Sequence, residues 1–171
     1  IAQLSEMLWG FLPKWGIVMQ PVAFLLFLTA QIAESKRVPF DLPECESELV
    51  AGYFTEYSAM KMALFMLGEF VGLVVISAVT TLFFLGGYHI PFLLDDGFHF
   101  AGTVVELSPL SVFLLRHVAF VTKVLFLLFL QMLIRWTLPR FRYDQLMHLG
   151  WKILLPLSLA NLVVTALVAI Y

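Results

Sequence analysis

Four long apolar runs, separated by shorter polar segments, dominate the pattern along the chain. A helix needs about 20 apolar residues to cross a hydrocarbon layer about 30 Å thick. Runs that meet this length cover residues 15–33, 59–85, 111–134 and 151–171. Backbone polar groups in lipid must be satisfied within the segment, so each run is predicted to be a transmembrane helix, the first kinked at Pro21. The predicted fold class is an all-α polytopic membrane protein with four transmembrane helices.

The polar segments differ in charge, and this difference predicts the side of the membrane that each one faces. Lys and Arg are concentrated in residues 34–58 and 135–150, whereas residues 86–110 contain neither. Positively charged loops stay on the inner side of a membrane. We therefore expect 34–58 and 135–150 to face the inside, and 1–14 and 86–110 to face outward.

A short hairpin is predicted in the outer segment. The sequence Asp95-Asp96-Gly97 lies between residues 88–94 and residues 98–105. An Asp-Gly pair between two such runs favours a tight turn between antiparallel strands.

A lateral helix is predicted over residues 43–58. Asp41 suits the cap of a helix, Pro43 its first turn and Glu44 its third position. Apolar or small residues then recur at a spacing of three to four, at Leu42, Cys45, Leu49, Gly52 and Tyr53. This pattern is typical of an amphipathic helix at the membrane border.

Composition supports the bilayer as the solvent and restricts the chemistry of the chain. Hydrophobic residues make up 61% and charged residues 13%, about half the usual share in soluble proteins. The single cysteine and four scattered histidines offer neither an intrachain disulfide nor metal-ligand spacing. Any redox centre is therefore expected on another chain. Because the sequence begins at Ile1 without a signal-peptide pattern, we expect a piece of a longer polytopic protein.

The first inner segment carries an unusual density of acids. Five carboxylates fall within fifteen residues, at Glu34, Asp41, Glu44, Glu46 and Glu48. One interpretation is that they only cap a helix and are otherwise solvated, which suits Glu44 and Glu46. It explains Glu34, Glu48 and Glu56 poorly. Crowded, partly dehydrated carboxylates resist ionisation, so the alternative is a group that takes up and releases protons.

Two charges lie near the middle of predicted spans. Glu69 and Lys123 both fall near mid-membrane, where a lone charge costs at least about 2.5–3.5 kcal/mol. We expect the two to pair or to share a hydrated cavity. The alternative is a structural ion pair that only fixes helix packing.

Two stretches resemble one family. Residues 33–58, AESKRVPFDLPECESELVAGYFTEYS, closely resemble the signature loop of the H subunit (also called subunit 1) of proton-translocating NADH:quinone oxidoreductase, respiratory complex I. Residues 138–152, LPRFRYDQLMHLGWK, resemble the loop before the last span of the same subunit. Family members are about twice as long, so the chain resembles their C-terminal half. The departures at Ser35, Lys36 and Cys45 remove no carboxylate.

The resemblance implies a membrane subunit that forms part of a quinone chamber and couples quinone reduction to proton translocation. Quinone (ubiquinone or menaquinone) is the implied substrate. NADH, FMN and the iron–sulfur clusters belong to partner subunits, and no metal or flavin is expected on this chain. The implied partners are other membrane-arm subunits and the quinone-site subunits of the peripheral arm, in a bacterial plasma membrane or mitochondrial inner membrane.

The motif match assigns roles to particular residues. The chamber is expected to be lined by Arg37, Val38, Phe40 and Asp41. Proton coupling is expected of Glu34, Glu44, Glu46 and Glu48, and, from their charge and placement, of Glu56, Glu69 and Lys123. The second inner loop is expected to brace the docked arm through Arg140, Arg142 and Asp144.

Three other functions fit parts of the sequence. The nearest is the homologous membrane subunit of a membrane-bound hydrogenase or formate hydrogenlyase. A secondary transporter would also place carboxylates at the midplane, but the sequence has no inverted repeat. The third is a passive membrane anchor for soluble subunits.

Overall fold

The computed structural model describes residues 7–8, 12–41, 55–94, 97–100 and 103–170. The chain divides into two compact units. Unit 1 comprises Ile1–Pro21 and Val75–Phe129, and unit 2 comprises Val22–Val74 and Leu130–Tyr171. Each unit is therefore described by itself.

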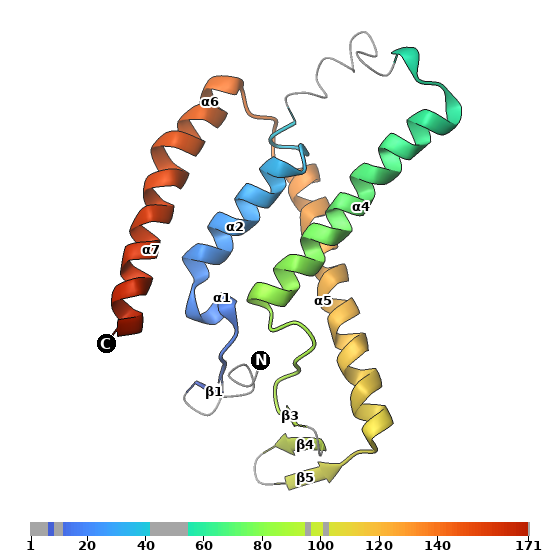
Figure 1. Ribbon diagram of the computed structural model, residues 1–171, viewed down its shortest axis with the longest axis vertical. Helices are drawn as coiled ribbons and strands as arrows, with labels where there is room; N and C mark the ends of the chain where they lie inside the picture. Colours follow the sequence, from blue (N-terminus) through green and yellow to red (C-terminus); the bar gives the residue numbers. More distant parts are fainter. Residues whose placement is uncertain (1–6, 9–11, 42–54, 95–96, 101–102, 171) are drawn as a thin grey trace. The chain divides into compact units, whose positions relative to one another are not determined.

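Within the described residues, three helical segments are long and apolar enough to cross a membrane (Figure 1). They are α4 (Ala59–Phe84), α5 (Pro109–Thr137) and the continuous helical stretch Tyr143–Val168. Most of their apolar side chains are exposed, which suits helices solvated by lipid. The helices α4 and α5 cover the runs from which the second and third spans were predicted. The chain is thus a helical, multi-pass membrane protein.

The first apolar run is broken rather than kinked. It forms α1 (Gly16–Met19) and α2 (Pro21–Glu34), separated by Gln20. Proline lacks an N–H donor and fits the first position of a helix, so Pro21 begins α2 instead of bending a longer one. With 14 residues, α2 is about 21 Å long, which is shorter than the hydrocarbon layer. The single helix expected over residues 15–33 is therefore wrong in this respect.

The last helical stretch begins earlier than expected. It consists of α6 (Tyr143–His148), the π-helical turn η3 (Leu149–Leu154) and α7 (Leu155–Ile170). The connection after α5 is correspondingly short, because residues 143–150 of the predicted loop are helical. The Gln145 side chain accepts a hydrogen bond of 3.2 Å from the Arg142 N–H, which helps to start the helix there.

The π-helical turn has a local cause. Pro156 has no N–H and its ring crowds the preceding turn, so regular α-helical bonding cannot pass through it unchanged. The helix widens just before this proline, and the Leu155 N–H donates to the carbonyl of Gly150, five residues back.

Small antiparallel sheets occupy the segments next to the helices. Between α4 and α5, β3 (Leu93–Leu94) pairs with β4 (Gly97–Phe100), and β4 pairs with β5 (Thr103–Glu106). The register places Leu94 opposite Gly97, which confirms the predicted hairpin. The return run 98–105 is not one strand, because it is divided between β4 and β5. A second sheet pairs β1 (Met7–Leu8) with β2 (Leu12–Pro13).

In unit 1, α1 and the residue that precedes it lie close to the end of α4. A Cβ atom on Gly16 would stand 2.6 Å from the Phe83 carbonyl oxygen, so only glycine permits this approach. Gly86 has φ +70° and faces Trp15, whose Nε1 would be 2.6 Å from an added Cβ. Both the backbone conformation and the contact therefore require glycine at position 86.

The core of unit 2 joins α2, the end of α5 and the start of α6. Its buried members are Leu28, Ile32 and Phe40. Partly buried side chains pack around them, namely Phe24, Leu130, Ile134, Phe141, Leu146 and Leu149. Phe40 belongs to the acidic inner segment, so this packing fixes the start of that segment.

The predicted lateral helix lies mostly outside the described residues. Its described end contains a 3-10 turn at Thr55 and Glu56, after which Tyr57 and Ser58 are not helical. The prediction is therefore wrong for these last two residues. Ala59, the first residue of α4, has φ +42°, a left-handed conformation. The centre of the Tyr57 ring lies 5.0 Å from that of Phe65.

Candidate functional site

The candidate site is built on the segment that follows α2 in unit 2. The Ser35 hydroxyl donates to the Ile32 carbonyl at 2.8 Å, and the Phe40 N–H donates to the Arg37 carbonyl at 2.8 Å. These bonds end the helix and turn the chain. The Phe141 N–H then donates to the Pro39 carbonyl at 3.0 Å. The segment after α2 and the segment before α6 are thus joined through their backbones.

Asp41 and Arg140 form an ion pair between the segment after α2 and the segment before α6. Arg140 Nη2 lies 3.2 Å from Asp41 Oδ2, and the Asp41 side chain is 5% exposed against 30% for Arg140. Removing a carboxylate from water is costly, and a cation offsets much of that cost. Arg140 was expected to brace a docked partner, but its described ionic contact is with the acidic segment of its own chain.

Arg37 and Glu69 form a second ion pair, between the acidic segment and the interior of α4. Arg37 Nε lies 2.6 Å from Glu69 Oε1, and the side chains are 11% and 23% exposed. Neither atom meets hydrogen-bond geometry within the described residues, so the contact is one of charge. The Arg37 guanidinium also lies 5.0 Å from the centre of the Phe70 ring.

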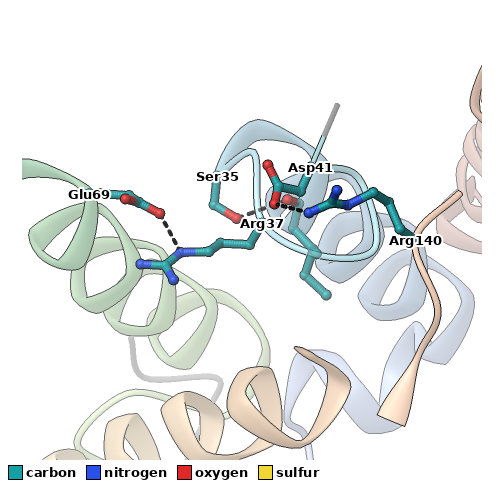
Figure 2. Close-up of polar contacts among 6 residues, drawn as sticks. Ser35, Arg37, Asp41, Glu69 and Arg140 are labelled. Atoms are coloured by element: carbon teal, nitrogen blue, oxygen red, sulfur yellow. Dashed lines mark hydrogen bonds and ion pairs between the residues drawn. The ribbon is translucent and has the colours of Figure 1, made fainter. Parts of the chain in front are cut away.

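The two pairs leave the same short segment in different directions. Figure 2 shows Arg37 reaching toward Glu69 while Asp41 turns toward Arg140. Glu69 lies about 15 Å along α4 from Ala59, at 1.5 Å per residue. The acidic segment is therefore connected by charge to a carboxylate well inside a membrane-spanning helix.

Lys123 makes different contacts from those expected. In unit 1 its Nζ donates to the carbonyls of Leu85 at 2.8 Å, Gly87 at 3.0 Å and His89 at 2.6 Å. It also lies 4.3 Å from the centre of the Trp15 ring. The structure thus gives Lys123 and Glu69 each a partner other than the one we expected.

The Lys123 contacts suit a structural charge. An ammonium group has three N–H donors, and each has a carbonyl acceptor here. The three carbonyls lie in the segment just after α4, so Lys123 joins that segment to α5. The expected alternative was a structural ion pair with Glu69, and the structure gives Lys123 carbonyl acceptors in its place.

The remaining predicted residues divide into three groups. Phe40 is buried and Val38 half-buried beside the two ion pairs. Exposed side chains belong to Glu34 at the end of α2, Glu56 before α4, and Arg142 and Asp144 at the start of α6. The acids of the predicted lateral helix lie outside the described residues: Glu44, Glu46 and Glu48.

Phe141 is a functional candidate that the sequence did not single out. Its ring centroid lies 5.7 Å from that of Phe40, with the planes 32° apart. The sequence signal for it was an aromatic residue between two arginines, Arg140 and Arg142. The predictions for that stretch rested on its charged residues alone. Phe141 also borders a cavity of about 380 Å³ within unit 2. The other lining residues are Asp144, Gln145, His148, Leu149 and Ile153.

This cavity has the mixed lining of a small-molecule site. Apolar walls come from Phe141, Leu149 and Ile153, whereas Asp144, Gln145 and His148 provide polar groups. Positions 145, 148 and 149 fall on one side of the helix at three-to-four spacing, and Phe141 comes from the segment just before it. Phe141 and Leu149 also pack against the core around Phe40, so the cavity adjoins the acidic segment.

Comparison with known proteins places the chain beside one group of membrane subunits. The family model described as NADH dehydrogenase matches residues 1–166. An H subunit of NADH-quinone oxidoreductase from Cytophaga hutchinsonii is 46% identical over 151 residues, which are 88% of this chain and 42% of that protein. The corresponding protein of Bdellovibrio bacteriovorus is 48% identical over 164 residues, 93% of this chain and 42% of that protein. An H subunit from Geobacter metallireducens is 48% identical over 154 residues, which are 90% of this chain and 39% of that protein.

The match is long in this chain but partial in its relatives. The chain spans about two fifths of the length of these curated relatives.

Proposed function

The chain belongs to the NADH dehydrogenase family, and from that premise we propose that it forms part of the quinone chamber of an NADH-quinone oxidoreductase and couples quinone reduction to proton translocation. Three relatives carry the name of the H subunit of that enzyme. The proposal concerns the part of the subunit that this chain represents.

The quinone side of the proposal is supported by the aromatic pair and the cavity next to it. Phe141 gives a half-buried apolar surface for a quinone ring or its isoprenoid tail, and the buried Phe40 ring packs against it. The adjoining cavity has about 380 Å³ and carries Gln145 and His148 as hydrogen-bonding groups. Such a combination of apolar walls and few polar groups suits an amphipathic ring.

Reduction of the quinone supplies the electrical signal. Two electrons, delivered by iron–sulfur clusters of partner subunits, and two protons convert the quinone to its quinol. A developing anion in a low-dielectric chamber interacts strongly with charges nearby. Arg37 and the Asp41–Arg140 pair are the described charges next to Phe40, so they respond first.

Arg37 then transmits the signal to the membrane. A negative charge in the chamber attracts the Arg37 guanidinium and weakens its hold on Glu69, 2.6 Å away. A carboxylate inside a span that loses its cation takes up a proton, because its charged form is disfavoured there. Moving a charge against the membrane potential costs about 2.3 kcal/mol per 100 mV, so the redox step provides the driving force.

Other residues of the chain take supporting roles in this proposal. Glu34, Glu44, Glu46, Glu48 and Glu56 deliver protons from the cytoplasmic or matrix side. Arg142 and Asp144, exposed at the start of α6, contribute to the surface that meets the peripheral arm. Lys123 holds the end of α4 in place through its three carbonyl contacts.

The Arg37–Glu69 contact carries the proposal and defines its test. Glu69→Gln in the full-length subunit of the intact complex should lower NADH:quinone turnover at least tenfold, about 1.4 kcal/mol in barrier. Electron transfer from NADH to ferricyanide, which does not use the quinone site, should stay unchanged. Glu106→Gln on β5 is the matched control and should behave like the natural protein. A passive anchor would instead tolerate Glu69→Gln with both rates intact.

A further inference from the structure

A second cavity lies in unit 1, away from the residues of the candidate site. It measures about 400 Å³ and is lined by residues from the start of α5 and the segment after α4. Tyr88, Pro109, Val112 and Phe113 form its largely apolar walls, and Arg116 and His117 supply nitrogen donors. Its described lining contains no carboxylate, so its charge suits an anion.

Aromatic contacts fix the shape of this cavity. The Tyr88 ring stacks on Phe120 with centroids 4.4 Å apart and lies 5.2 Å from the His117 ring. Phe113 lies 4.1 Å from His117 on the same helix. These contacts hold the segment after α4 against α5 and keep the wall formed by Tyr88 in place.

One nitrogen of His117 is already engaged, which leaves the other for a ligand. His117 Nδ1 lies 2.9 Å from the Phe113 carbonyl oxygen. A carbonyl only accepts hydrogen bonds, so Nδ1 carries a proton. Nε2, on the other side of the ring, donates when the ring is the imidazolium, the form that a phosphate anion favours. The side chain is exposed. Arg116 is half-buried and has a further contact within the protein.

The depth of these residues matches the head groups of a bilayer. With 29 residues, α5 is about 43 Å long, which exceeds the hydrocarbon layer of about 30 Å. Arg116 lies about 10 Å along the helix from Pro109. An α5 centred in the bilayer therefore puts Arg116 close to the lipid–water border, within reach of phosphate groups. Tyr88 is also a residue typical of that border.

We propose that this cavity binds the phosphodiester head group of an anionic phospholipid. Arg116 and His117 donate to the phosphate oxygens, and Phe113 and Val112 contact the glycerol and the first acyl carbons. The acyl chains continue toward the middle of the bilayer along the exposed apolar face of α5, which includes Leu114, Val118 and Val121. Free phosphate would use the two donors but not this face, so a lipid is the better match. The inference is independent of the proposed coupling function.

The test compares lipid retention in the intact complex that contains the full-length subunit. The complex is reconstituted in nanodiscs of phosphatidylcholine with a minor fraction of phosphatidylglycerol and is then transferred into detergent. The lipids that stay bound to the complex are quantified by mass spectrometry. The natural protein should retain at least one more phosphatidylglycerol per complex than Arg116→Gln. Arg135→Gln, which removes the cation at the other end of α5, is the matched control and should retain as much as the natural protein.

Two further arms keep the test decisive. Arg116→Lys preserves the charge and should keep the lipid, whereas His117→Gln should at least halve its retention. These two variants decide the question if Arg116→Gln does not assemble. A large excess of inorganic phosphate should not displace the phosphatidylglycerol. Equal retention in the natural protein and the substituted proteins, or displacement by inorganic phosphate, would overturn the proposal.

Discussion

Arg37 Nε lies 2.6 Å from Glu69 Oε1, and this contact joins a loop residue to a carboxylate inside α4. A charge in the interior of a span is disfavoured unless it has a partner. The partner comes from the segment that also contains Phe40 and Asp41, next to the aromatic pair. A change of charge at that pair therefore has a direct route to Glu69.

Substitution of Arg37 should lower NADH:quinone turnover, because Glu69 then loses its cationic partner. Arg37→Gln leaves the Glu69 carboxylate without its cation, which should destabilise the charged form by about 2 kcal/mol or more. NADH:quinone turnover should fall at least tenfold, and Arg37→Lys should recover part of it. The rates are measured with quinone and with ferricyanide on the same membranes. Arg135→Gln serves as the control, and equal quinone rates in Arg37→Gln and the natural protein would contradict the assignment.

The Asp41–Arg140 pair should behave as a coupled unit. Asp41→Asn and Arg140→Gln each leave a half-buried or buried charge alone and should lower the stability of the assembled complex by about 1–3 kcal/mol. The double variant should cost less than the sum of the two single variants. Thermal unfolding of the purified complex gives the four values of this cycle. Strict additivity would mean that the 3.2 Å contact contributes nothing measurable.

The Lys123 contacts predict a stability effect. Lys123→Met keeps the length of the side chain but loses three hydrogen bonds to carbonyls and the contact with Trp15. Hydrogen bonds to charged groups contribute about 1.5–3 kcal/mol each, so an overall loss of about 2–4 kcal/mol is expected after relaxation. Thermal unfolding and the yield of assembled complex measure it. Thr122→Ala, one position away on an exposed face, is the control. An equal melting temperature for both variants would contradict the structural role given to the Lys123 contacts.

The aromatic pair predicts an effect on quinone affinity. Phe141→Ala opens the half-buried wall shared by the cavity and the core, so the KM for quinone should rise severalfold while the ferricyanide rate stays constant. Phe40→Ala removes a buried ring and should in addition destabilise the protein by about 3 kcal/mol. Phe141→Leu retains an apolar side chain and should be milder than Phe141→Ala. An unchanged KM for quinone in Phe141→Ala would mean that this cavity does not take part in quinone binding.

The helices were predictable because their signal is local. Apolar runs of sufficient length give α4 and α5 directly, and the Asp-Gly turn gives the pairing of β3 with β4. Pro21 indicated that the first apolar run is not a regular helix. Whether a proline kinks a helix or begins a new one depends on the contacts of Gln20 and its neighbours, which the sequence does not specify. The early start of the last helix was missed because the charges of residues 138–152 suggested a loop.

The partners within the site were not predictable in the same way. Asp41 and Arg140 are 99 positions apart, and nothing in their local sequence says that they meet. Lys123 was expected to pair with an acid, yet backbone carbonyls satisfy it, and such acceptors leave no mark in a sequence. The sequence did identify Arg37, Asp41, Glu69 and Arg140 as candidates, so it was the pairing between them that required the structure.

The proton-to-electron ratio of the Glu69→Gln complex tests the central claim most directly. The intact complex is reconstituted in proteoliposomes, and proton uptake is measured against NADH oxidised with quinone as acceptor, with Glu106→Gln as the control. A carboxylate that receives its signal from Arg37 predicts a lower ratio in Glu69→Gln and an unchanged ratio in the control. An unchanged ratio in Glu69→Gln would contradict the account.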